Sequence, residues 1–351
     1  MSERGSTDRR RRASRPASRP RLTTRLSVQP GTRLILWLHV AVILAGLVAL
    51  GLSGVEIGPS WLDGAGAVAI GTTYVWILAA RTGGQVLVFV PLALAVGLVA
   101  VVLDNGVLRS GTAVMTSAAG AALGVMVTVP APRFLSAARE VVVALLVAGV
   151  GAVASVGFEP RLTLERFDYA TLAVSLGLVF ALVYRLGAGL HGLGTRGLVI
   201  VVGGGLTLAV AMAYAELLRR YGTPGLVHSA FDAVHWMRDH LGASPRPLQA
   251  LLGIPALTWG CHQRARRRQG WWACAFGVTA TAPVATLVMD PALPLVELAL
   301  IEVYTLLVGL AIGFVVIRLD LALTGSRGRG ARRAEEATAV RPEPVRTAAL
   351  L

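Results

Sequence analysis

Residues 293–317 read LPLVELALIEVYTLLVGLAIGFVVI, and this run of apolar side chains decides the class of fold. A helix needs about 20 predominantly apolar residues to cross the hydrocarbon core of a bilayer, and this run is long enough. Comparable apolar stretches precede it along most of the chain. The sequence therefore predicts an all-α fold, a polytopic transmembrane helix bundle of about ten spans.

Composition excludes an ordinary soluble domain, because 55% of the 351 residues are hydrophobic and only 15% are charged, against about 25% charged in soluble domains. The sequence predicts that the chain is divided into three regions. These are a disordered, arginine-rich tail at 1–33, a transmembrane domain at 34–318 and a second disordered tail at 319–351. The ten spans are expected at 34–53, 65–80, 86–103, 111–129, 141–157, 169–183, 198–218, 248–261, 271–289 and 293–317.

The basic residues give the expected orientation. All 33 are arginine, and the formal net charge is +14. Arginines gather in the two tails and in alternate loops, so the positive-inside rule predicts that both termini are cytoplasmic. The composition is typical of a GC-rich bacterial genome, which makes the plasma membrane the expected location. Orientation explains the arginines more simply than nucleic acid does, so no nucleic-acid partner is expected.

An amphipathic helix is predicted at about 226–241, in the long outer loop. Apolar residues fall on one stripe at helical spacing, while His228, Asp232 and His235 fall on another. These residue types suit zinc, but without an H-E-x-x-H grouping a solvated face on the membrane surface is the favoured interpretation. No cofactor is therefore expected.

Short matching patterns in the two halves of the chain predict an inverted repeat of five plus five spans. A glutamine precedes a proline by six positions in both, at Gln85–Pro91 and at Gln249–Pro255. Secondary transporters with such repeats place their sites where matching spans are interrupted by Gly or Pro. Pro91 and Pro255 are therefore candidate site residues, and the alternative is that they only kink two helices.

Two glutamates are candidate proton or substrate residues. Glu302 lies near mid-depth of the last span, where an ionisable group is a functional hypothesis by default. Gly309 and Gly313 continue its helix face as a small-xxx-small motif, so Glu302 should face a neighbouring helix. Glu140 is its counterpart in the repeat but follows Arg139, which favours an interfacial ion pair. The alternative for Glu302 is a structural hydrogen bond between helices.

A basic cluster followed by two tryptophans lies between the eighth and ninth spans. Arginines near a membrane attract anionic headgroups, and indole rings prefer the headgroup level. We therefore expect anionic lipids of the inner leaflet as partners of Arg264, Arg266, Arg267, Arg268, Trp271 and Trp272.

The stretches 184–194 (YRLGAGLHGLG) and 264–272 (RARRRQGWW) resemble those of actinobacterial multi-pass membrane proteins that have no assigned function. This resemblance implies a location and no activity. The span count and the repeat also resemble the drug/metabolite transporter superfamily, although the long loop between the seventh and eighth spans departs from that pattern.

The best concrete interpretation is a transporter-like protein for a small solute or a lipid. One alternative is a non-transporting envelope scaffold or assembly factor. Another is a membrane-embedded enzyme of lipid or cell-envelope metabolism, but the first outer loop offers only Glu56 and Asp63 as acids. We therefore favour a role that is not enzymatic.

Overall fold

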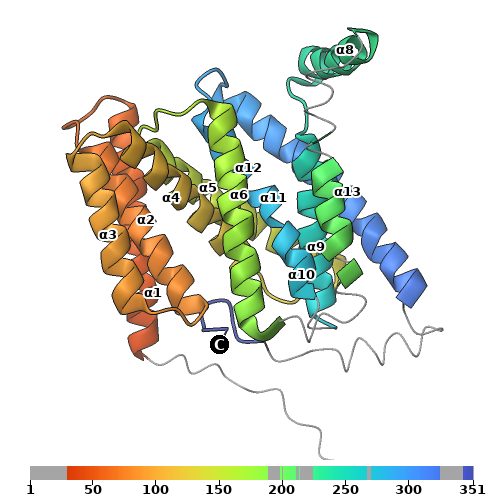
Figure 1. The fold of residues 1–351 in the computed structure, drawn as a ribbon, viewed down its shortest axis with the longest axis horizontal. Coiled ribbons are helices and arrows are strands. Elements are labelled where there is room, and N and C mark those ends of the chain that lie inside the picture. The colour runs from red at the N-terminus through yellow and green to blue at the C-terminus, as the bar shows by residue number, and fades with distance from the viewer. Residues whose placement is uncertain are drawn as a thin grey trace, which may run out of the picture.

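The computed structural model of the chain describes residues 30–188, 198–199, 201–210, 213, 224–266, 270–324 and 343–350. Within these ranges every regular element is a helix (Figure 1). Six helices are long and apolar enough to cross a membrane, at Arg33–Gly54, Leu62–Arg81, Phe134–Val156, Leu164–Leu186, Gly270–Met289 and Leu295–Leu323. The all-helical class of fold is confirmed, whereas the count of ten spans and the repeat are not.

The first six helices in chain order are α1 (Pro30–Gly54), α2 (Leu62–Arg81), α3 (Val86–Val102), α4 (Gly106–Met126), α5 (Phe134–Val156) and α6 (Leu164–Val183). A π-helix, η1 (Tyr184–Ala188), follows α6, and a short apolar helix covers Val201–Val210. The remaining elements are α8 (Pro224–Leu241), the π-helix η2 (Gln249–Gly253), α9 (Ile254–Arg264), α10 (Gly270–Phe276), α11 (Val278–Thr281), α12 (Pro283–Met289) and α13 (Leu295–Thr324).

The two ends of the bundle carry different features. In Figure 1 the start of α1 and the C-terminal residues lie at the lower end, while α8 lies beyond the upper end. α8 confirms the helix predicted at about 226–241 and begins slightly earlier. Its link to the bundle includes Arg238, which donates to the carboxylate of Glu297 at the start of α13.

Helix α4 forms the centre of the bundle, with 15 of its 21 residues buried. Most of these are Ala, Gly, Ser or Thr, which allow close approach of helix backbones. A Cβ on Gly120 would lie 3.1 Å from Cα of Gly151 on α5. The hydroxyls of Ser117 and Ser155 join the same two helices at 2.6 Å. Small side chains therefore hold α4 and α5 together at short range.

Glycines also set the packing of η2 and α9 against the broken helix α10–α12. A Cβ on Gly253 would lie 2.6 Å from the carbonyl carbon of Thr279, and one on Gly260 would lie 2.6 Å from the backbone nitrogen of Cys274. Neither substitution fits without a backbone shift, so these two segments touch main chain to main chain.

Helix α13 is the longest element, at 30 residues. Such a helix is about 45 Å long, which exceeds a hydrocarbon core of about 30 Å, and it runs obliquely across the bundle (Figure 1). It continues to Thr324, beyond the domain boundary predicted at 318. Residues 343–350, which the composition places in a disordered tail, are seated against the lower end of the bundle. Residues 1–29 lie outside the described part of the chain.

Candidate functional site

The carboxylate of Glu302 on α13 meets the side chain of Gln249 on η2. Gln249 Nε2 donates to both carboxylate oxygens at 3.1 Å and to the carbonyl oxygen of Ala280 at 2.9 Å. Gln249 is fully buried, and its Oε1 has no hydrogen-bond partner among the described residues. Glu302 therefore faces a neighbouring helical segment, which is the orientation that the glycines along its own helix predict.

Helix α13 is held beside α9 by the two glycines that follow Glu302. A Cβ on Gly309 would lie 2.6 Å from Cβ of Ile254, and one on Gly313 would lie 3.0 Å from Cβ of Thr258. The small-xxx-small motif therefore forms a helix–helix contact, because a side chain of α9 packs against each of the two glycines. This contact fixes the height of Glu302 relative to η2.

The π-helix η2 is fixed at its start as well. The backbone N–H of Arg246 donates to Thr305 Oγ1 at 3.0 Å, and the Arg246 guanidinium donates to the carbonyl oxygen of Pro283 at 2.8 Å. Thr305 lies three residues beyond Glu302, on the same face of α13. π-helical turns in proteins are frequent at functional sites, because they displace a side chain from the ordinary helical register. Here the turn begins at Gln249 itself.

The chemistry available to this pair is that of one carboxyl group and one amide inside a helix bundle. A bare carboxylate at such a position is costly, so it is protonated, paired or hydrated. Gln249 supplies hydrogen-bond donors to the carboxylate and, through Oε1, a free acceptor. The pair can therefore take up a proton or a ligand that donates hydrogen bonds.

The structure does not bring the two predicted prolines together. Pro91 lies inside α3, an edge helix of which only Gly97 and Ala100 are buried (Figure 1). Pro255 lies in the first turn of α9, next to η2, and nine of the eleven residues of α9 are buried. Pro255 belongs beside the Glu302–Gln249 pair, whereas Pro91 has a different environment.

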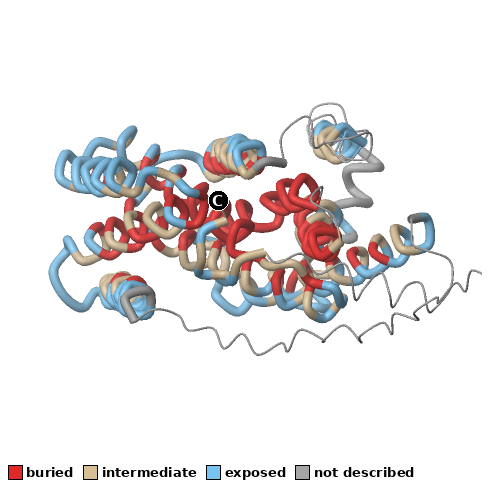
Figure 2. The backbone as a smooth tube through the Cα atoms, turned by 90° about the horizontal axis from the view of Figure 1, so that it is seen from below, coloured by how far each residue is buried: buried red, intermediate tan, exposed pale blue. Residues whose placement is uncertain are grey.

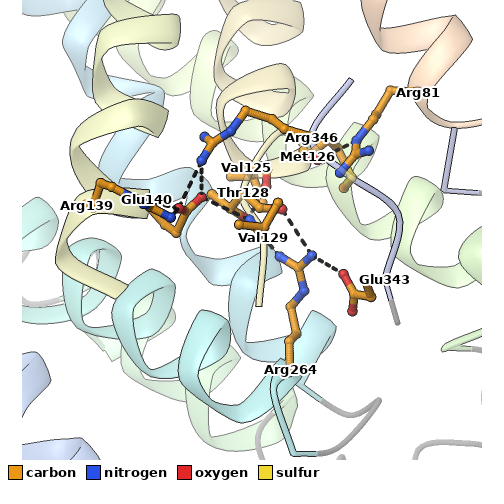
Figure 3. Close-up of polar contacts among 10 residues, drawn as sticks. All are labelled: Arg81, Val125, Met126, Thr128, Val129, Arg139, Glu140, Arg264, Glu343 and Arg346. Atoms are coloured by element: carbon orange, nitrogen blue, oxygen red, sulfur yellow. Dashed lines mark hydrogen bonds and ion pairs between the residues drawn. The ribbon is translucent and has the colours of Figure 1, made fainter. Parts of the chain in front are cut away.

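Figure 3 shows a second polar cluster, at the lower end of the bundle, around Arg264. The guanidinium is fully buried and donates to Thr128 through Oγ1 at 2.7 Å and the carbonyl oxygen at 3.1 Å. It also pairs with the carboxylate of Glu343 at 2.5 Å and lies 3.5 Å from the ring centroid of Trp271. Arg264 is therefore held by a hydroxyl, a carbonyl, a carboxylate and an aromatic face.

Glu140 is the acidic member of the same cluster and has no exposed side-chain surface. Its carboxylate accepts hydrogen bonds from the backbone N–H of Val129 at 3.0 Å and from Arg139 at 2.9 Å. Arg346 donates to both of its oxygens, at 2.9 and 2.8 Å. The predicted pair of Glu140 with Arg139 is present, but Glu140 is buried, and a residue from the far end of the chain completes its shell.

Arg81, at the end of α2, binds the C-terminal residues through their main chain. Its guanidinium donates to the carbonyl oxygens of Val345, at 2.8 Å, and of Ala348. Its own carbonyl oxygen accepts from the N–H of Leu350 at 2.7 Å. It also donates to the carbonyl oxygen of Met126 at 3.2 Å. The arginine therefore joins α2, the end of α4 and the C-terminal segment.

The structure gives three of the six predicted lipid-anchor residues a buried environment. Arg264, Trp271 and Trp272 lie inside the protein, and Arg264 is held there by Thr128 and Glu343. The side chain of Arg266 is half-buried. Arg267 and Arg268 lie outside the described residues. The local sequence favoured a membrane-interface position for this cluster, because the residues that bury Arg264 are remote from it in sequence.

Helix α8 shows no metal site in the part of the chain that the structure describes. Asp232 and His235 are exposed, and the side chain of His228 lies outside the described residues. No group of three or more His, Cys, Asp or Glu side chains is placed to hold a metal ion among the residues searched.

Sequence reasoning missed Gln249 as a partner of Glu302 and missed the C-terminal residues entirely. A glutamine in a short apolar span was the available signal for the first. Comparison of the chain with protein-family models, with curated proteins and with solved structures gave no match. The geometry of the two polar clusters is therefore the observation that bears on function.

Proposed function

We propose that the chain is a transporter-like membrane protein for a small solute, with Glu302 and Gln249 as its proton-linked binding residues. The single observation that carries this proposal is the hydrogen-bonded pair itself, a carboxyl group and a fully buried amide at a π-helical turn. Transporters place their sites at such interruptions of spanning helices, because the freed polar groups can bind a solute.

The proposal includes ten spans with both termini in the cytoplasm of a bacterium. Helices found within each of the ten predicted stretches support it. They include α3, α4 and α9, which are not among the six that are both long and apolar enough to span a membrane. The start of α1 and the C-terminal residues lie at the same end of the bundle, and α8 lies at the opposite end (Figure 1). A chain whose two ends lie on one side of the membrane crosses it an even number of times. Arginines gather at that common end, as the positive-inside rule requires of a cytoplasmic face.

Everted bacterial membrane vesicles test the proposal. Vesicles that contain the protein are energised with ATP, and the pH gradient is followed by quenching of an acridine dye. Amino acids, sugars, carboxylates and organic cations are added in turn. We expect one of these classes to dissipate the gradient with the wild-type protein and not with Glu302→Gln, because the amide cannot carry a proton.

Glu297→Gln is the matched control, since Glu297 lies on the same helix but pairs with Arg238 near the upper end. This variant should keep the solute response at equal expression. The proposal fails if no solute class gives a response, or if Glu302→Gln responds as the wild type does.

A further inference from the structure

The C-terminal segment, residues 343–350, places each of its two charged side chains against a buried charge of opposite sign. Glu343 pairs with Arg264 at 2.5 Å, and Arg346 pairs with Glu140 at 2.8 Å. The two sites are adjacent along the chain between α4 and α5, because Arg264 binds Thr128 while Glu140 binds Val129 (Figure 3).

The bundle also recognises the main chain of the segment. Arg81 donates to two backbone carbonyl groups of the segment and accepts the N–H of Leu350. Figure 2 views the molecule from below and shows the C-terminal residues over the middle of the bundle, among buried residues. Arg81 binds the backbone of the segment, while Arg264 and Glu140 bind its side chains. Contacts of both kinds fix the register in which a protein binds a short peptide.

The receiving charges belong to the bundle itself, with Arg264 at the end of α9 and Glu140 on α5. The side chains of Arg264 and Glu140 have no exposed surface, whereas those of Glu343 and Arg346 keep 20% and 31%. A buried charge without its partner is strongly unfavourable. Without the segment Glu140 would keep Arg139, whereas Arg264 would keep, among the described residues, only neutral partners such as Thr128 and the ring of Trp271. The lower end of the bundle therefore favours an occupant that offers a carboxylate to Arg264 and a second cation to Glu140, three residues apart.

We propose that the lower end of the bundle is a peptide-binding site for a Glu-x-x-Arg segment, and that the chain's own residues 343–350 occupy it as an exchangeable ligand. Residues 325–342 connect the segment to α13, and this attachment keeps its local concentration high. The partial exposure of both ligand charges gives the segment a way to leave without unfolding a spanning helix. A free peptide of the same sequence binds the site when the tethered one has left. This inference is independent of the proposed transport.

The test begins with the full chain, so that folding takes place with the segment attached. A protease site is inserted between residues 330 and 331, and the purified protein is cleaved in detergent. A fluorescent peptide with the sequence of residues 343–351, EPVRTAALL, is then added, and its binding is followed by anisotropy. We expect stoichiometric binding as the cleaved fragment is replaced, and competition by the unlabelled peptide.

The matched control peptide exchanges the two charges, with Glu343→Arg and Arg346→Glu, so that composition and net charge stay the same. We expect it to bind at least about tenfold more weakly, which corresponds to losing one favourable charge pair. Equal binding of the two peptides would show non-specific attraction and overturn the site. Failure of the native peptide to replace the cleaved fragment would overturn its exchange.

A second measurement uses retention of the cleaved fragment during gel filtration. The wild-type fragment should stay with the bundle, and a fragment that carries Glu343→Gln and Arg346→Gln should separate from it. Retention of both fragments alike would contradict recognition by charge.

Discussion

Gly253→Ala should destabilise the protein strongly, because the glycine lies where η2 touches α11. The new Cβ would lie 2.6 Å from the carbonyl carbon of Thr279, 2.7 Å from Cα of Ala280 and closer still to the nitrogen of Ala280. Ordinary contacts of this kind begin at 3.4 Å, so the two backbones must separate by close to an ångström. Overpacking of this type costs about 1–3 kcal/mol.

The same shift would strain the hydrogen bond from Gln249 to the carbonyl oxygen of Ala280, which contributes about 1 kcal/mol. A total loss of about 2–4 kcal/mol corresponds to a fall in melting temperature of roughly 5–15 °C for a large domain. Tryptophan fluorescence of the detergent-solubilised protein during heating measures this midpoint.

Gly149→Ala is the matched control, because Gly149 is also helical and a Cβ there meets nothing within 4 Å. Alanine has the higher helix propensity, by about 1 kcal/mol, so this variant should melt at the wild-type temperature or slightly above it. If Gly253→Ala melts as Gly149→Ala does, the close backbone contact between η2 and α11 is wrong.

Three further predictions follow from the polar clusters and the arrangement of the helices. Glu302→Leu should lower the melting temperature because Gln249 keeps only the carbonyl oxygen of Ala280 as an acceptor. Glu302→Gln should be nearly neutral in stability, since its amide can accept from Gln249 Nε2 and also donate to the free Oε1 of Gln249. Equal melting of the two variants would refute the pairing. Glu140→Gln and Arg346→Gln should each lower the free energy of unfolding. The double variant should lose less than the sum of the two single losses, because a buried charge without its partner is the costly state. Additive losses in this double-mutant cycle would show that the pair does not interact. In intact cells a membrane-impermeant maleimide should label Asp239→Cys on α8 and leave Arg266→Cys unlabelled, and the reverse pattern would invert the proposed orientation.

Local sequence patterns predicted the elements of the fold well. The apolar runs predicted the all-helical class of fold, and the helical spacing of residues around Asp232 and His235 predicted α8. The glycines at 309 and 313 predicted that α13 packs closely against a neighbour, because a small-xxx-small stripe has the same meaning wherever it occurs. These features depend on residues within a few turns of one another.

The candidate sites were harder to predict, because their partners are distant in sequence. Glu302 is 53 residues from Gln249, and Glu140 is 206 residues from Arg346. Arg264 followed by two tryptophans satisfies a local rule for membrane interfaces. Its actual environment depends on Thr128, 136 positions away, and on a tail whose composition is typical of disorder. No local pattern could supply those contacts.

The composition of α4 has a consequence for how the protein is made. This helix is long enough to cross a membrane, yet it carries Arg109 and many Gly, Ser and Thr residues, and it is not among the six that are apolar enough to do so. The translocon releases segments into lipid according to their hydrophobicity. We expect α4 to wait at the translocon until the strongly apolar α5 has been synthesised, and the two to enter the bilayer as a hairpin. The insertion of α4, the central helix of the bundle, would then depend on α5, the helix that follows it in the chain.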